Sequence, residues 1–300
     1  MYKYIISGIL VQSVLPVPVF EQIWNPERSD TYFDSVSLTL GECPETLSNS
    51  IGSPGPLIVN REAAIAHTPN GGRLYLRDRA IVIDHQAARD MDVVADYTAA
   101  IFLPILGYLN GRIPLHAAAI ESEKGIVLLC GASGHGKSTL SARMSRELGW
   151  KILHDDLVIL DRDLEVGILR FGLPRLKLWS DSVEQLDMTH FDLRPDRAQE
   201  GKLHLQFETP DERATSKITA IVKLSWADGP PEVRDLRKSE LFAALMNNTY
   251  WPELAYWMDR NSHVRSWGVQ FSNQIHGLSF SRSKSDRFED LDLRDLENAI

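Results

Sequence analysis

The residues best suited to chemistry lie in one short segment near the middle of the chain. Residues 131–138 fit the pattern glycine, four residues, glycine, lysine, serine. Glycines at these places let successive backbone N–H groups turn inward around phosphate oxygens, while the lysine neutralises the β and γ phosphates and the serine ligates Mg²⁺. The pattern predicts a site for ATP with Mg²⁺. Its residues, with the threonine that follows, are Gly131, Ala132, Ser133, Gly134, His135, Gly136, Lys137, Ser138 and Thr139.

Two adjacent acids supply the next candidates. Asp155 and Asp156 follow a short apolar run, about where a phosphate-loop protein places the carboxylate that holds the metal ion or its water. Two carboxylates could divide the duties of general base and metal ligand. A solvated turn between strands also favours aspartate, so the position alone leaves both interpretations open.

Other polar residues are weaker candidates. His116 lies fifteen residues before Gly131, and a histidine at the start of a strand is usually a packing residue. Arg175, Lys177 and Lys202 could reach phosphate or substrate, although single basic residues are usually solvated. The sequence contains no His-Arg-Asp or Asp-Phe-Gly element of protein kinases, no zinc-type Cys/His spacing and no Gly-x-Ser-x-Gly elbow.

The elements around the loop are those that a phosphate site requires. The run 125–130 is almost wholly apolar, which predicts a central strand covered on both faces. It pairs in a hairpin-like pattern with 113–120 through the polar turn 121–124. After the loop, Leu140, Met144 and Leu148 recur four apart and predict a helix with one apolar stripe. Strand, loop and helix therefore follow in the expected order.

The whole pattern predicts an α/β protein with two domains. Short β-type runs at 8–11, 37–40, 57–59, 73–76 and 80–83 indicate a small β-rich domain over residues 1–90. A helix over 91–109 opens a second domain, 91–300. The further elements expected in this domain are strands at 152–154, 157–160, 166–171 and 220–224 and helices at 239–246 and 252–259.

Composition limits the function classes. The net charge of −9 disfavours a nucleic-acid partner, because such binding depends on Lys and Arg. The apolar stretch 97–109 contains Pro104 and falls short of the roughly 20 residues that span a bilayer, so a buried helix and no membrane partner are expected. The start lacks the features of a secretory signal. Cys43 and Cys130 are expected to be reduced thiols in a cytoplasmic protein.

Three motifs together resemble a known family. Residues 115–119 (Leu-His-Ala-Ala-Ala), the loop 131–139 and the triplet 154–156 (His-Asp-Asp) are spaced as in the C-terminal catalytic domain of the HPr serine kinase family, over about residues 95–210. The resemblance implies a P-loop kinase domain of the HPr kinase type, a mixed sheet with flanking helices, behind the β-rich domain. It also implies catalytic roles for His116 and Asp155, the latter as base, with Asp156 nearer the metal.

The sequence departs from the HPr kinase pattern at two places. Thr139 stands where HPr kinases carry glutamate, and residues 171–179 (Phe-Gly-Leu-Pro-Arg-Leu-Lys-Leu-Trp) replace an Arg-Gly-rich signature. Both departures argue against HPr as the substrate. The Leu-Pro-Arg-x-Lys-Leu-Trp segment and the β-rich front domain are more similar to the lasso peptide kinases, which phosphorylate the C-terminal serine of a precursor peptide.

The expectation is therefore an ATP-dependent kinase acting on a Ser or Thr hydroxyl of a peptide or protein. Asp155 would take the proton, His116 would orient that carboxylate, and Lys137 with Arg175 or Lys202 would offset charge. Ser138 and Asp156 would hold Mg²⁺. A small-molecule kinase and a nucleotide-sensing module that transfers nothing are the alternatives, and a homo-oligomer is left open.

Overall fold

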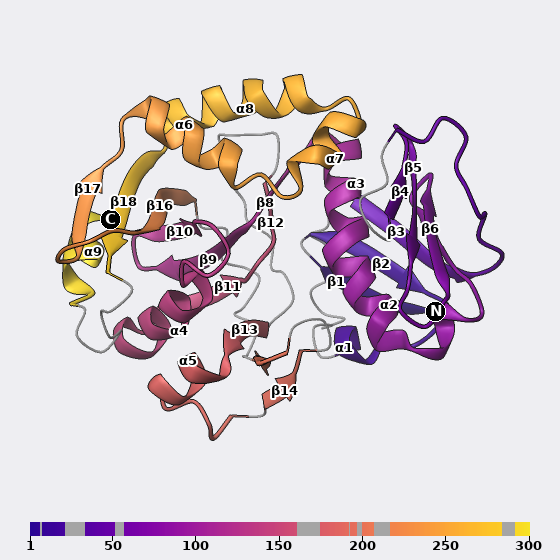
Figure 1. Ribbon diagram of the computed structural model, residues 1–300, viewed down its shortest axis with the longest axis horizontal. Helices are drawn as coiled ribbons and strands as arrows, with labels where there is room; N and C mark the ends of the chain where they lie inside the picture. Colours follow the sequence, from indigo (N-terminus) through magenta and orange to yellow (C-terminus); the bar gives the residue numbers. More distant parts are fainter. Residues whose placement is uncertain are drawn as a thin grey trace. The chain divides into compact units, whose positions relative to one another are not determined.

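The protein has a mixed α/β fold, in which sheets of mixed strand direction are flanked by helices (Figure 1). The structure is a computed structural model that describes residues 1–6, 8–21, 34–51, 57–160, 175–191, 193–196, 200–206, 217–283 and 292–300. The strand expected at 166–171 lies outside these residues.

The chain packs as two compact units. The first comprises Met1–Pro114 with Trp251–Val264, and the second comprises Leu115–Tyr250 with Arg265–Ile300. This division places the 91–109 helix in the first unit, whereas the sequence set the boundary at residue 90.

The first unit contains a seven-stranded sheet in its described part, with strand order β1-β2-β3-β7-β6-β5-β4. The alternating burial of β3 leaves Val36 and Leu38 in the core, as expected for a strand with one buried face. All five predicted β-type runs of this region are strands. The bounds are β1 Tyr2–Ile6, β2 Ile9–Ser13, β3 Asp34–Leu40, β4 Leu57–Val59, β5 Ala63–His67, β6 Arg73–Arg77 and β7 Ala80–Ile83, with helix α1 at Pro18–Glu21.

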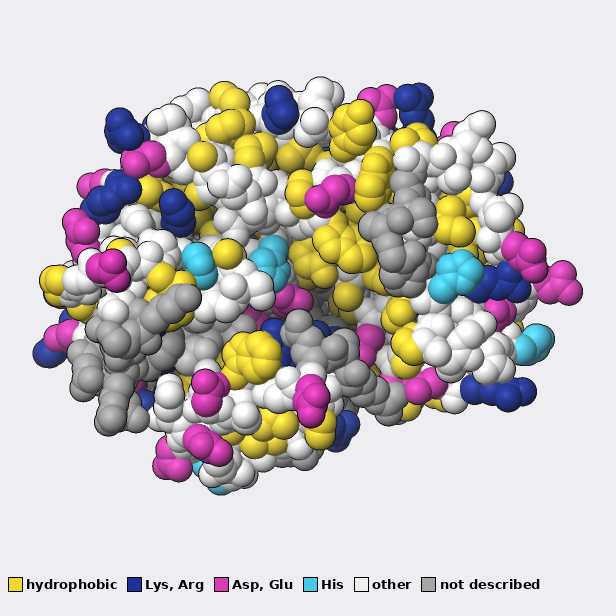
Figure 2. Space-filling view, viewed as in Figure 1, with side chains coloured by type: hydrophobic (Ala, Val, Ile, Leu, Met, Phe, Trp, Pro, Cys, Tyr) yellow, Lys and Arg dark blue, Asp and Glu magenta, His cyan; other side chains and the backbone are white. Residues whose placement is uncertain are grey.

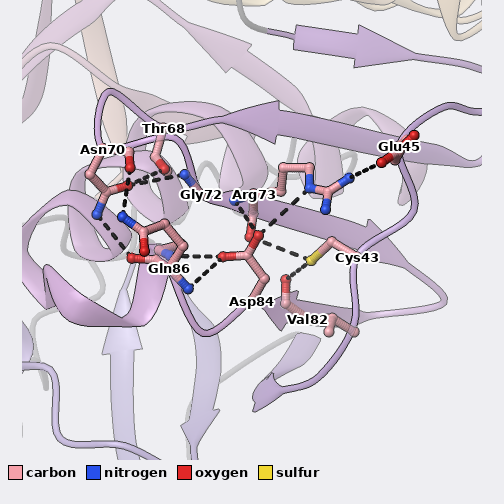
Figure 3. A network of polar contacts seen from close by, with 10 residues as sticks. Cys43, Glu45, Thr68, Asn70, Gly72, Arg73, Val82, Asp84 and Gln86 are labelled. Atoms are coloured by element: carbon pink, nitrogen blue, oxygen red, sulfur yellow. Dashed lines mark hydrogen bonds and ion pairs between the residues drawn. The ribbon is translucent and has the colours of Figure 1, made fainter.

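A network of polar contacts fixes the end of the β6–β7 hairpin (Figure 3). Asp84 accepts hydrogen bonds from the backbone N–H groups of Arg73 at 2.9 Å and Ala87 at 2.7 Å. The Cys43 thiol donates to the backbone oxygens of Arg73 and Val82. Burial raises the pKa of Cys43 to about 11. Cys43 is therefore a structural thiol. Both cysteines are free, as predicted, and both are buried.

The predicted 91–109 helix is present but changes its winding. It consists of α2 (Met91–Tyr97), a π-helical turn (Thr98–Phe102) and α3 (Leu103–Leu109), after a 3₁₀ turn at Ala87–Arg89. The π turn ends two residues before Pro104, which lacks the N–H that a regular helix would use there. Among the described helices this one alone could cross a membrane by length and composition, yet 67% of its apolar window is buried inside the fold.

The second unit is built on a sheet of order β11-β9-β10-β16-β18-β17. β10, β16 and β18 run parallel, while β9, β11 and β17 pair antiparallel. The strand expected over 113–120 is interrupted at His116, which separates β8 from β9. The bounds of the six strands are β9 Ala117–Ser122, β10 Gly125–Cys130, β11 Lys151–His154, β16 Ile218–Trp226, β17 Glu232–Asp235 and β18 His276–Arg282. Two further strands, β8 (Ile113–Leu115) and β12 (Val158–Leu160), do not belong to this sheet.

Helices cover this sheet. Leu140 and Met144 of α4 (Lys137–Leu148) are fully buried in the core cluster, which also holds residues of β9, β10 and β16. α6 (Lys238–Asn247) packs against β18, where a Cβ at Gly277 would lie 2.9 Å from Leu241. α5 (Ser180–Gln185) and α9 (Arg294–Ala299) also belong to the second unit, whereas α7 (Pro252–Trp257) belongs to the first and the boundary between the units falls within α8 (Asn261–Gln274).

A separate three-stranded antiparallel sheet, in the order β13-β15-β14, also belongs to the second unit. Its strands are β13 (Arg175–Trp179), β14 (Leu193–Pro195) and β15 (Lys202–Gln206). Leu176 and Leu178 of β13 are buried in the same core cluster as α4, so this small sheet is anchored to the main core.

Candidate active site

The predicted phosphate loop connects the end of β10 to the start of α4. Gly131 has φ 153°, and a Cβ there would lie 2.9 Å from the carbonyl oxygen of Leu224. Gly136 has φ 81° and is the N-cap of α4. Both positions require glycine, because a side chain would be strained or would collide with β16. The loop thus lies at the N-terminus of a twelve-residue helix, where backbone N–H groups and the helix dipole favour anions.

Lys137 is buried and folded over the loop. Its Nζ donates to the carbonyl oxygen of Gly131 at 2.8 Å and lies 2.8 Å from Nε2 of His116. Burial lowers the pKa of this ammonium, and the carboxylates of Asp156 and Asp155 oppose the shift. Because an ammonium can only donate, His116 accepts through Nε2 and carries its proton on Nδ1.

The other ring nitrogen of His116 contacts the second acid. Nδ1 lies 3.1 Å from Oδ1 of Asp156 and 3.1 Å from its backbone oxygen. Asp156 has φ 72°, a left-handed conformation that is uncommon outside glycine and that is found at strained functional positions. The prediction that His116 orients Asp155 is therefore corrected, because the structure places His116 against Asp156.

Asp155 is held by the loop serine. Ser138 Oγ donates to Asp155 Oδ1 at 2.8 Å, and the backbone N–H of Lys177 donates to Oδ2 at 2.9 Å. The sequence paired Ser138 with Asp156 at the metal. In the structure the serine instead contacts Asp155. Asp155 is therefore the acid beside the loop and Asp156 the acid beside His116, the reverse of the expected arrangement.

The two acids also differ electrostatically. Burial raises the pKa of Asp155, and the adjacent charge of Asp156 raises it further. Burial also acts upward on Asp156, but the hydrogen bond from His116 and the charges of Lys177 and Lys137 hold its pKa at about 2. The Asp156 side chain is 44% exposed and therefore accessible to a ligand. Paired acids whose pKa values are pushed apart are typical of acid–base sites.

These groups share one pocket of about 330 Å³. Its volume falls at the lower end of the range of small-molecule sites. Lys202 lines it and stacks 5.0 Å above the Trp179 ring, whereas Arg175 is not among the lining residues. The predicted site residues that do line the pocket are His116, Ser133, Gly134, Gly136, Lys137, Ser138, Thr139, Asp155, Asp156 and Lys202.

Several site residues were not among the predicted ones. Asn248, after α6, accepts from the Gly131 N–H through Oδ1 at 2.8 Å, and its backbone oxygen accepts from the backbone N–H of His116 at 2.7 Å. Trp226 and Arg282 end the adjacent strands β16 and β18 and line the pocket, with the guanidinium 4.0 Å above the indole ring. No local motif marks these residues, because strand register brings Trp226 and Arg282 together and the end of α6 brings Asn248 to the loop.

Comparison with known proteins leaves the family unassigned. No protein-family model matches the chain, and no curated protein matches it. Within the described ranges, no group of three or more His, Cys, Asp or Glu side chains is arranged to hold a metal ion. The Ser138 hydroxyl and the Asp155 carboxylate in mutual contact are hard oxygen donors, which fit Mg²⁺ when phosphate oxygens and water complete its shell.

Proposed function

We propose that the protein is an ATP-dependent kinase that phosphorylates a Ser or Thr hydroxyl of a peptide or protein. In this proposal the second unit is a P-loop catalytic domain of the HPr kinase type. The observation that carries it is the contact of loop residues Lys137 and Ser138 with His116 and Asp155, which come from separate segments of the chain. Two buried, free cysteines are in keeping with a cytoplasmic protein.

The nucleotide would lie on the loop. Backbone N–H groups of 131–139 and the Lys137 ammonium would bind its phosphates, and Ser138 with Asp155 would hold Mg²⁺, which neutralises phosphate charge when bound. Trp226 offers an aromatic surface beside the loop, and the base would stack there. The chain would thus supply contacts for the phosphates, the metal ion and the base.

The acceptor hydroxyl would enter beside Asp156. Its oxygen forms a bond to the γ phosphorus while the bond from that phosphorus to the β–γ bridging oxygen breaks, ADP leaves with the electron pair, and the hydroxyl proton passes to Asp156. His116 orients this carboxylate. The low pKa of Asp156 is compatible with the role, because phosphoryl transfer depends mainly on positioning and electrostatic stabilisation.

A peptide acceptor suits the site better than a nucleic acid. Acidic and basic side chains are intermingled over the described part of the face in Figure 2, in keeping with the net charge of −9. We infer that the acceptor is the C-terminal serine of a lasso precursor peptide, on the strength of the Leu176, Lys177, Leu178, Trp179 segment whose Lys177 and Trp179 line the pocket.

The test measures phosphate transfer from ATP to a peptide ending in serine, with product mass as the readout. Asp156→Asn should lower kcat by roughly 10²–10⁴-fold with ATP affinity retained, as for loss of a general base. Asp155→Asn should raise the Mg²⁺ concentration that half-saturates activity. Asp187→Asn is the matched control, since Asp187 is also left-handed (φ 51°) but exposed in a turn outside the pocket.

Each alternative gives a different result. Phosphorylated metabolites without phosphopeptide would identify a small-molecule kinase, and ATP binding without any product would identify a nucleotide sensor. If Asp155→Asn abolishes transfer while Asp156→Asn keeps it, the base is Asp155 and the assignment made here is wrong.

A further inference from the structure

The three-stranded sheet has one face buried and one face turned to the pocket. Leu176 and Leu178 of β13 lie in the core cluster, and the alternate residues Lys177 and Trp179 line the pocket. In the β13–β15 ladder Lys177 is paired with His204, and Trp179 with Lys202. The polar face therefore gathers cationic groups beside the two acids of the candidate site.

A buried carboxylate holds the first of these cations. Asp196 follows β14, and its side chain is 3% exposed. Its Oδ2 lies 3.2 Å from Lys177 Nζ and 2.8 Å from His204 Nε2. Lys177 is in β13 and His204 in β15, while Asp196 directly follows β14, so all three strands of the small sheet contribute to the contact. A carboxylate buried to this degree costs several kcal/mol of desolvation unless it is paired, so the pairing fixes the Lys177 ammonium tightly.

Lys177 also touches the catalytic centre through its backbone. Its N–H donates to Asp155 Oδ2, so movement of this residue would disturb the acid that contacts Ser138. Lys137 approaches the same acids from the phosphate loop. Lys177 and Lys137 both line the pocket with Asp155 and Asp156, and the charges of both lysines act on the Asp156 carboxylate.

We infer that Asp196 and His204 are positioning residues that hold the Lys177 ammonium where the phosphoryl group is transferred. Lys177 stabilises the negative charge on the γ-phosphoryl oxygens as the bond to the bridging oxygen breaks and the bond to the acceptor oxygen forms. An ammonium has three donors, so Asp196 leaves donors for those oxygens. The inference rests on the proposed kinase function.

A double-mutant cycle tests this inference. Lys177→Met should lower kcat by roughly 10²–10³-fold, the usual loss for one preorganised donor to transition-state charge. Asp196→Asn should lower kcat roughly tenfold or more with KM for ATP nearly unchanged, and Lys177→Arg should retain part of the activity. In the Lys177→Met background, Asp196→Asn should change kcat by less than about twofold, because residues that act as one unit are non-additive.

The control is a second His–Asp contact in the same unit. His276 Nε2 lies 2.8 Å from Asp235 Oδ1, but the Asp235 side chain is 83% exposed. Asp235→Asn should leave kcat unchanged. If Asp196→Asn does not fold, judged by its thermal transition, His204→Gln replaces it in the cycle. If Asp196→Asn lowers kcat by the same factor in the wild type and in the Lys177→Met variant, the role of Asp196 is merely structural and the inference is overturned. Phosphate transfer by the wild type would still support the proposed kinase function in that case. A wild type that binds ATP without transfer would overturn both.

Discussion

His154 makes folding stability depend on pH in a way that can be measured. It ends β11 and is 1% exposed. Burial lowers its pKa from 6.5 to about 3, and the backbone of Leu157 opposes the shift without reversing it. Below pH 6.5 His154 therefore binds a proton in the unfolded chain but stays neutral in the folded chain, so the free energy of unfolding falls as the pH falls.

The size of this effect follows from proton linkage. The contribution of His154 is fully present above its unfolded pKa of 6.5 and is lost progressively down to about 3. At about 1.4 kcal/mol per pH unit, lowering the pH from about 7 to about 4.5 should remove roughly 2–3 kcal/mol of unfolding free energy. That is a large part of a typical 5–15 kcal/mol stability.

The assay is urea unfolding followed by circular dichroism at both pH values. His154→Leu should lose roughly 2–3 kcal/mol less than wild type between them, since the contributions of the acids cancel in the comparison. His190→Leu, at an exposed position, is the matched control and should keep the wild-type loss. Equal acid losses for His154→Leu and wild type would refute the argument that His154 is buried in its neutral form.

Two further predictions concern the nucleotide. Asn248→Ala leaves the Gly131 N–H without its acceptor, so it should cost about 1–3 kcal/mol of unfolding free energy and weaken ATP binding measured by calorimetry. Equal stabilities of the variant and the wild type would contradict this role of Asn248. Trp226→Ala should weaken ATP binding more than tripolyphosphate binding, because base stacking is worth about 1–3 kcal/mol. The control variant Trp226→Phe keeps an aromatic ring and should bind both ligands nearly as tightly as the wild type. Equal losses of affinity for both ligands after Trp226→Ala would exclude a contact between Trp226 and the base.

The loop and its neighbours could be predicted because their signals are local. The apolar run before Gly131 and the four-residue spacing of Leu140 and Met144 correspond to β10 and α4. The hairpin of β9 with β10 followed from the polar turn between them. A strand, a turn and a helix each depend on neighbours in sequence, so patterns of a few residues were sufficient.

The features that could not be predicted from the sequence depend on contacts between residues far apart in the chain. The strand β18 was not predicted. It is buried between β16 and β17, so its serines lie among apolar residues and residues 276–282 show no clear alternation of apolar and polar types. The link of His116 to Asp156 was assigned to the wrong acid, because spacing cannot show which of two adjacent carboxylates a left-handed backbone turns toward the ring. Asp196 and His204 meet only through the pairing of β14 with β15.

The left-handed backbone at Asp156 restricts which amino acids natural variation can place there. Glycine and asparagine enter this conformation readily, whereas β-branched residues do so at a steep energetic penalty. A randomised library at this codon, sorted only for folded protein, should therefore be enriched in Gly, Asn and Asp. The same library sorted for kinase activity should be enriched in Asp alone. Comparing the residues enriched in the two sorts separates the requirement of the backbone conformation from the requirement of catalysis.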